Sequence, residues 1–218
     1  MPIIRTLASS IHGRYLVAPA AAPGPAPLVV GFHGYAEDAE AQLERLQSMP
    51  GAGTWILVSI QGLHRFYRGR SEDVVASWMT RQDRELAITD NAAYVAAAVD
   101  AVAREWRVRA PLVFAGFSQG VAMAFRAACS SPRPVGGLVA LGGDVPPELD
   151  RERLARVSAA LLGRGLHDGW YPAAQWSADE ARLRGAGVST RSVELDAGHE
   201  WTPAFSEAAG EFLRDLRR

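Results

Sequence analysis

Two apolar stretches limit the fold of this chain more than any other feature of the sequence. The stretches "LVVGF" (residues 28–32) and "LVFAGF" (residues 112–117) contain no charged side chain. A strand that is apolar on both faces must be covered on both sides, as in a parallel sheet sandwiched between helices. The sequence therefore predicts an α/β fold with a mostly parallel sheet and helices on both faces.

Short apolar runs alternate with longer helix-like segments along the whole length, which is typical of a doubly wound α/β fold. Strands are predicted at Tyr15–Ala18, Leu28–Phe32, Thr54–Ile60, Leu112–Gly116, Gly137–Leu141, Ala159–Gly163 and Thr190–Leu195. Helices are predicted at Ala39–Met49, Ile88–Trp106, Gln119–Ser130, Pro172–Gly185 and Pro203–Leu216. The 218 residues suffice for one well-buried core, so a single domain over residues 1–218 without a large cap domain is expected.

Two segments depart from this alternation. Residues 18–27, "APAAAPGPAP", are too rich in proline for a helix or strand and are predicted to form an exposed connection. Residues 61–90 show no clear period and follow a predicted strand. Long irregular loops at the carboxyl ends of parallel strands are usually functional, so this loop is expected to lie near the site.

Charge and cysteine content restrict the partners and the compartment. The net charge is −1, the 23 basic residues are all arginine, and they are scattered, which argues against nucleic acid or an anionic membrane as a partner. The single cysteine, Cys129, fits a reducing compartment. No stretch looks like a signal peptide or approaches a membrane span, so we expect a cytoplasmic protein without stable membrane association. The sequence leaves open whether it is a monomer or a homodimer.

The segment "GFSQG" places Ser118 between an apolar strand and an apolar helix. A G-x-S-x-G turn in this context holds a serine hydroxyl out at the edge of a sheet, because its glycines let strand and helix approach closely. The amide of Gln119 would then lie at the start of the helix, where it can stabilise a developing oxyanion. Ser118 is therefore the predicted nucleophile.

A serine nucleophile needs a base, and the base needs an acid to orient it. His199 follows the last predicted strand and is the predicted base, whereas His167 is expected to be a neighbouring polar residue. Asp168 follows the predicted strand at Ala159–Gly163 and is the preferred acid, in the chain order nucleophile, acid, base. Asp144 is the second choice, and Asp196 is expected to be a solvated turn residue.

The rest of the site is expected on loops that follow strands. The backbone amide of Tyr35, after the strand at Leu28–Phe32, is the predicted second donor of the oxyanion hole. The substrate pocket is expected among apolar side chains on such loops, and these are Phe66, Tyr67, Trp78, Met79, Trp170 and Trp201.

The motifs "FHGYAED", "GFSQGVAMA", "GLHDGWYP" and "AGHEW" resemble, in this order, those of the phospholipase/carboxylesterase family of α/β-hydrolases, which includes acyl-protein thioesterases. The segment "SWMTRQDRELAITDNAAYV" resembles that family's tryptophan-containing loop and following helix. The resemblance covers nearly the whole chain and implies a metal-free serine hydrolase with the triad Ser118, Asp168 and His199. Departures at Met79, Val121 and Arg164 concern the substrate rather than the triad.

The expected function is that of a carboxylesterase acting on a small-molecule ester of short to medium acyl chain through an acyl-enzyme. No cofactor or metal is expected, because no histidine pair has metal-ligand spacing and no phosphate-binding glycine loop occurs. Two alternatives remain at this point. A thioesterase or lysophospholipase would use the same residues, and a non-catalytic binding protein could share the fold.

Overall fold

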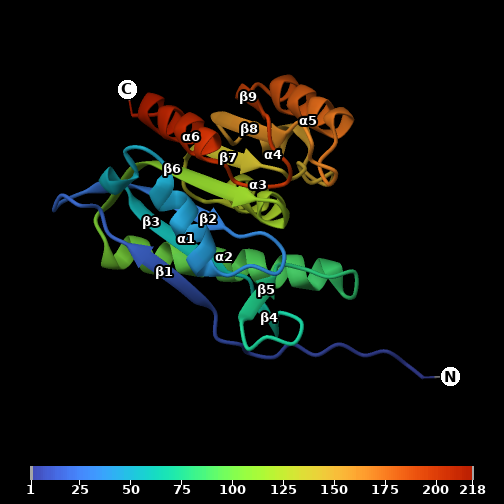
Figure 1. Ribbon diagram of the computed structural model, residues 1–218. Helices are drawn as coiled ribbons and strands as arrows, with labels where there is room; N and C mark the ends of the chain where they lie inside the picture. Colours follow the sequence, from blue (N-terminus) through green and yellow to red (C-terminus); the bar gives the residue numbers. More distant parts are fainter. Residues whose placement is uncertain (1, 218) are drawn as a thin grey trace.

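The computed structural model describes residues 2–217 and contains one large sheet covered by helices on both faces (Figure 1). The strands are β1 (Arg14–Ala18), β2 (Ala26–Phe32), β3 (Ile56–Gln61), β4 (His64–Tyr67), β5 (Val74–Ser77), β6 (Val108–Phe117), β7 (Val135–Leu141), β8 (Ala159–Gly165) and β9 (Ser189–Leu195). The helices are α1 (Ala39–Ser48), α2 (Arg84–Glu105), α3 (Gln119–Ser130), α4 (Arg151–Leu154), α5 (Ala173–Gly185) and α6 (Pro203–Asp215), with a 3₁₀ turn at Ala52–Thr54.

The seven-stranded sheet has the order β1-β3-β2-β6-β7-β8-β9. Only β1 is antiparallel to its neighbour, and the remaining pairs are parallel. The two central apolar stretches, β2 and β6, are hydrogen-bonded to each other, with Val30 opposite Phe114. The predicted α/β fold with a mostly parallel sheet is therefore confirmed, and both faces of the central strands are buried as expected.

Alternate side chains of each central strand enter two separate cores. Leu28, Val30 and Phe32 of β2 pack with residues of α2, α3 and α5, whereas Val29 packs with residues of α1 and α6. This follows from the two-residue period of a strand. The helices α2, α3 and α5 therefore cover one face of the sheet, and α1 and α6 cover the other (Figure 1).

The segment from residue 61 to residue 90 is more regular than the sequence predicts. It contains an antiparallel hairpin of β4 and β5, in which Phe66 lies opposite Val75, and α2 begins at Arg84 rather than at Ile88. Charged residues within the hairpin interrupt the alternation of apolar and polar side chains by which a strand is recognised in a sequence. Arg68 at its turn donates a hydrogen bond to the carbonyl of Ala36, so the hairpin lies against the loop that follows β2.

Helix α2 has the length and composition to cross a membrane, with a mean hydropathy of 1.3 in its most apolar window. The expectation that no segment approaches a membrane span is wrong by this criterion. Its alanines raise the hydropathy of a helix whose inner face belongs to the protein core, where Val95, Ala98, Val99 and Val102 pack against the sheet and α3. A core helix satisfies the same criterion, so the helix alone is weak evidence for a membrane span.

Candidate active site

Ser118 occupies the sharp turn between β6 and α3. Its backbone has φ 53° and ψ −123°, a conformation that non-glycine residues rarely adopt and that the surrounding structure must hold in place. The turn depends on two glycines. A β-carbon at Gly116 would lie 2.5 Å from the carbonyl oxygen of Gly120, and one at Gly120 would lie 2.1 Å from the carbonyl oxygen of Phe32. Only glycine allows β2, β6 and α3 to converge beneath Ser118.

Ser118, His199 and Asp168 form a continuous hydrogen-bonded line. The hydroxyl of Ser118 lies 2.8 Å from Nε2 of His199, and Nδ1 of His199 lies 2.8 Å from Oδ2 of Asp168. A carboxylate can only accept a hydrogen bond, so Nδ1 carries the proton and Nε2 is free to accept one from the serine. The three residues follow β6, β8 and β9, whose carboxyl ends meet at one edge of the parallel sheet.

Asp168 is buried and held by the chain itself. Its Oδ1 accepts hydrogen bonds from the amides of Trp170 (2.8 Å) and Tyr171 (3.0 Å), which leaves Oδ2 for the histidine. The side chain is 1% exposed. The backbone turn from residue 168 to residue 171 therefore holds the carboxylate in place independently of His199.

The other carboxylates and the other late histidine lie outside this line. His167 and Asp196 are exposed and pair with each other, with 3.0 Å between Nε2 and Oδ1. Asp144 is exposed and has no hydrogen bond to His199. Only Asp168 contacts the imidazole among the acids considered from the sequence.

The loop that follows β2 packs against the start of α3. A β-carbon at Gly34 would lie 3.2 Å from the ring of Phe117, and the carbonyl oxygens of Phe32 and His33 closely approach Gly120. Within residues 2–217, the amides of Tyr35 and Gln119 donate no hydrogen bond to the chain. Both amides are therefore free to bind a ligand oxygen. The side chain of Tyr35 is exposed, so the residue can contribute to an oxyanion site only through its backbone amide.

A buried histidine, His33, supports the loop that follows β2 from the protein interior. Gly62 N donates to Nε2 of His33 over 3.0 Å, and Nδ1 lies 2.6 Å from the carbonyl oxygen of Gly34. One nitrogen must accept and the other must donate, so the imidazole is neutral with its proton on Nδ1. Burial lowers the pKa of His33 from its ordinary value of 6.5.

An ion pair between Glu37 and Arg45 connects the loop that follows β2 to His199 through the ring of Phe117. Oε2 of Glu37 accepts from Gly34 N over 2.7 Å, and both carboxylate oxygens accept from Arg45 over 2.6 Å. The pKa of Glu37 is lowered because the ion pair and hydrogen bonds of the carboxylate outweigh its burial. The Arg45 guanidinium lies 4.3 Å over the ring of Phe117, whose centre is 5.1 Å from that of His199.

The side chain of Gln119 anchors the other half of the site. Its Oε1 accepts from Trp78 N (2.9 Å) and from the hydroxyl of Ser77 (3.2 Å), while Nε2 donates to the carbonyl of Met79 over 3.1 Å. These bonds tie the first residue of α3 to the end of β5. The sequence offered one signal for this role, because Gln119 is a polar residue next to the nucleophile in an otherwise apolar segment.

An open cleft of about 360 Å³ lies over Ser118. Its lining consists of Ser118, Gln119, Gly142, Gly143, Asp144, Trp170, Tyr171, Pro172, Gln175 and His199. The lining thus includes both Ser118 and His199, and Trp170 is 84% exposed. Behind the cleft, the hydroxyl of Tyr171 lies 3.1 Å from Oδ2 of Asp179, and the pKa values of both groups are raised mainly by burial.

Of the aromatic and apolar side chains expected in the pocket, only Trp170 lines this cleft. Trp78 is fully buried, and its Nε1 donates to the carbonyl of His33 over 2.8 Å, so it supports the loop from the core. Met79 is half-buried, and its backbone carbonyl accepts a hydrogen bond from Nε2 of Gln119. The sequence placed these two residues on a strand-end loop correctly but could not show that their side chains turn inward.

The remaining three expected pocket residues lie elsewhere. Trp201 donates from Nε1 to the hydroxyl of Ser206 over 2.9 Å and lines a separate hollow between α1 and α6. Phe66 and Tyr67 belong to the β4–β5 hairpin, where the ring of Phe66 packs 5.7 Å from that of Tyr35 and Tyr67 is exposed.

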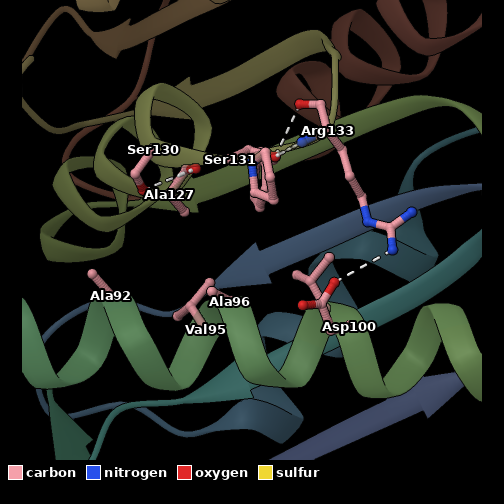
Figure 2. A pocket seen from close by; sticks show the side chains of 11 residues that line it. Ala92, Val95, Ala96, Asp100, Ala127, Ser130, Ser131 and Arg133 are labelled. Carbon is pink, nitrogen blue, oxygen red and sulfur yellow. Dashed lines mark hydrogen bonds and ion pairs between the residues drawn. The ribbon is translucent and has the colours of Figure 1, made fainter.

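A small cavity of about 30 Å³ lies between α2 and α3 (Figure 2). Its wall consists mainly of small apolar side chains such as Ala92 and Ala96, and Arg133 at one end pairs with Asp100 over 3.3 Å. The hydroxyl of Ser130 donates to the carbonyl of Arg126, and that of Ser131 to the carbonyl of Arg133. The lining contains no base beside these serines, so the cavity is a gap in helix packing rather than a reaction site.

Within residues 2–217, no group of three or more histidine, cysteine, aspartate or glutamate side chains is arranged to hold a metal ion. Cys129 lies buried on α3, and burial raises the pKa of its thiol to about 11, so it is a poor nucleophile. The hydrogen-bonded line of Ser118, His199 and Asp168 is therefore the candidate for a reactive group within residues 2–217.

Comparisons with known proteins identify the fold and the family. Esterase PE8 is 24% identical in sequence and superimposes with a TM-score of 0.72 over 94% of this chain and 100% of its own. The Bacillus cereus carboxylesterase gives 15% identity and a TM-score of 0.73, with 94% of each chain covered. Acyl-protein thioesterase 2 of Zea mays gives 18% and 0.71, covering 94% of this chain and 99% of its own.

These likenesses establish the α/β-hydrolase fold, while the family follows from the sequence. A comparison with curated proteins gave no significant match. The model of the phospholipase/carboxylesterase family, in contrast, matches residues 20–216, nearly the whole chain. The chain therefore belongs to the phospholipase/carboxylesterase family of α/β-hydrolases.

Proposed function

We propose that this protein is a serine carboxylesterase that hydrolyses small esters of short to medium acyl chain through an acyl-enzyme. The observation that carries the proposal is the hydrogen-bonded line from Ser118 through His199 to Asp168, whose first two members line an open cleft. A binding protein would have no need to hold a serine in a strained turn beside a histidine oriented by a buried carboxylate.

In the proposed reaction, the hydroxyl oxygen of Ser118 attacks the ester carbonyl while its proton passes to Nε2 of His199. The carbonyl oxygen becomes an anion and accepts hydrogen bonds from the free amides of Tyr35 and Gln119. The dipole of α3 adds to this stabilisation, because Gln119 is its first residue. Asp168 holds the imidazole in the productive tautomer and stabilises its positive charge.

Collapse of this intermediate breaks the bond to the alcohol oxygen, which takes the proton from His199 and leaves. Water then enters, gives a proton to His199 and attacks the acyl-enzyme, and the acid is released as Ser118 recovers its proton. The proposed route uses only side chains and backbone amides of this chain. We propose that the protein acts in the cytoplasm on small molecules.

The size of the cleft supports a short to medium acyl chain. Its lining combines apolar groups, such as Pro172, with polar ones, such as Gln175, and it is open to solvent. The β4–β5 hairpin beside the loop that follows β2 carries exposed Arg65 and Arg68 as well as exposed Tyr67 and Val74, so it presents a mixed rather than a continuous apolar surface. A long acyl chain would therefore leave most of its methylene groups in water.

The proposal is tested with a panel of p-nitrophenyl esters and matched thioesters of graded chain length, using the wild-type chain and Ser118→Ala. Esterase activity that disappears in the variant is expected. Preference for thioesters by more than about tenfold in kcat/KM would make the protein a thioesterase with the same reactive residues. Activity that survives Ser118→Ala would contradict the mechanism.

A further inference from the structure

One carboxylate in the cleft, that of Asp144, has no partner. Within residues 2–217 it forms neither a hydrogen bond nor an ion pair with the chain. Three other acids around the site have partners. Asp168 accepts from His199 and two amides, Asp179 accepts from Val145 N, Tyr171 and Arg182, and Glu37 pairs with Arg45.

No arginine or lysine offsets the charge of this carboxylate within the cleft. The residues that line it include no arginine, and the whole chain contains no lysine. The cleft over Ser118 therefore has a negative potential on the side of the loop that follows β7, where Asp144 lies.

Trp170 brings an exposed aromatic face to the same cleft. Trp170 is 84% exposed, and within residues 2–217 no other tryptophan is classed as exposed. An exposed indole can present its ring face to a ligand in the cleft. An indole face and an unpaired carboxylate in one cleft are the combination that attracts ammonium groups, through the ring quadrupole and through charge.

Both residues line the cleft that also contains His199, which the leaving oxygen of the alcohol must approach. A β-carbon at Gly142, two residues before Asp144, would lie 3.2 Å from the His199 ring, and Trp170 N bonds Asp168. The leaving oxygen must come close to Nε2 of His199 to receive its proton. The carbonyl oxygen, in contrast, faces the amides of Tyr35 and Gln119. The substituent of the alcohol is thereby within reach of the loops that carry Asp144 and Trp170.

We propose that this site prefers esters whose alcohol portion carries a positive charge, such as a quaternary ammonium group, and that Asp144 and Trp170 recognise this charge. The proposal rests on the proposed esterase function and names its substrate class. Asp144 contributes through its charge and Trp170 through its ring face, so neither takes part in the bond-breaking steps.

Two esters of the same shape test the proposal. Butyrylcholine and 3,3-dimethylbutyl butyrate differ only in a quaternary nitrogen that replaces a quaternary carbon. We expect a kcat/KM about five- to tenfold higher for butyrylcholine at low ionic strength, and a ratio that falls as salt is added. A ratio of one or less in the wild-type protein overturns the proposal.

Three variants locate the effect. Asp144→Asn should bring the ratio of the two kcat/KM values to about one, and Asp144→Glu should keep most of the preference because it keeps the charge. Asp196→Asn is the matched control, since it removes an exposed carboxylate outside the cleft that pairs with His167. It should leave the ratio as in the wild type. Thermal unfolding of each variant shows that the fold is kept.

The outcomes separate this proposal from the esterase function on which it rests. Equal loss of both esters in Asp144→Asn, with no change in their ratio, overturns the recognition of charge and leaves the esterase intact. Equal effects of Asp144→Asn and Asp196→Asn do the same, because the effect would then come from net charge. Turnover of neither ester nor any p-nitrophenyl ester by the wild type contradicts the esterase function itself.

Discussion

Nε2 of His199 lies 2.8 Å from the hydroxyl oxygen of Ser118, although 81 residues separate them in the chain. The contact exists because β6 and β9 both end at the same edge of a parallel sheet. Because β7 and β8 lie between β6 and β9, the residues that follow β9 must carry His199 back along this edge to reach Ser118.

The first prediction concerns the acid that orients His199. Asp168→Asn should lower kcat by about 10⁴-fold with little change in stability, because the amide offers a donor where the imidazole needs an acceptor. Asp144→Asn should lower kcat for a neutral p-nitrophenyl ester far less, since Asp144 has no bond to His199. Steady-state kinetics with p-nitrophenyl butyrate measures both. The opposite ranking would move the acid to the loop after β7.

The second prediction concerns the glycine that follows the nucleophile. Gly120→Ala should destabilise the protein by about 3 kcal/mol, because the new β-carbon would lie 2.1 Å from the backbone carbonyl of Phe32. For a chain of this size, the melting temperature should fall by about 6–12 °C.

The matched control for this change is Gly185→Ala at the end of α5, where a β-carbon meets nothing within 4 Å. It should be neutral or stabilising by up to about 1 kcal/mol, because alanine favours the helix. Equal melting temperatures for the two variants would show that β2 and α3 are not packed as closely as described.

The third prediction concerns pH and His33. Its pKa is lowered in the folded protein, so below about pH 6.5 the unfolded chain binds a proton that the folded chain does not. The free energy of unfolding should therefore decrease as pH falls from 6.5 toward the lower pKa of the folded state, by up to about 1.4 kcal/mol per pH unit from this group. Above pH 6.5 this contribution is complete and constant.

Urea unfolding of the wild type and of His33→Gln between pH 5 and pH 7.5 measures this effect. The variant should be less stable at pH 7.5 and should lose less stability on acidification. His64→Gln is the control, because His64 is exposed on β4. A pH dependence that is unchanged in His33→Gln would mean that His33 is not held neutral by Gly62 and Gly34.

The sequence was sufficient for the architecture and for the order of the reactive residues. A strand as apolar as β2 must be buried on both faces. A serine between two glycines directly after such a strand is typical of a turn that exposes the serine hydroxyl at the sheet edge. The ends of parallel strands lie at one edge whatever the loops do. For this reason, Asp168 and His199 could be predicted to lie near Ser118 from the sequence alone.

The surroundings of these residues could not be predicted in the same way. Trp78 and Trp170 both occur on loops near strand ends, yet one is fully buried and the other is 84% exposed. Their orientation depends on partners that are distant in sequence, such as the carbonyl of His33 for Trp78. The hairpin of β4 and β5 was missed for a related reason, since pairing across a turn, rather than local periodicity, defines it.

The fourth prediction concerns the acyl chain. In a cleft of limited apolar wall, each added methylene gains about 0.8 kcal/mol until the wall ends, and further groups remain in water or overpack. We therefore expect kcat/KM for p-nitrophenyl esters to rise from acetate to a short or medium chain and to fall well before palmitate. Rates measured below and above micelle formation should agree. A maximum at palmitate, or a jump in rate on aggregation, would indicate a lipase.

The central claim is that Ser118 forms a covalent bond to the substrate's acyl group, and labelling tests it most directly. Intact-mass measurement after treatment with a fluorophosphonate should show one added label in the wild type, and peptide mapping should locate it on Ser118. Ser130→Ala, a serine on the same helix, should label normally, and Ser118→Ala should not label at all. A label on another residue, or undiminished labelling of Ser118→Ala, would contradict the account.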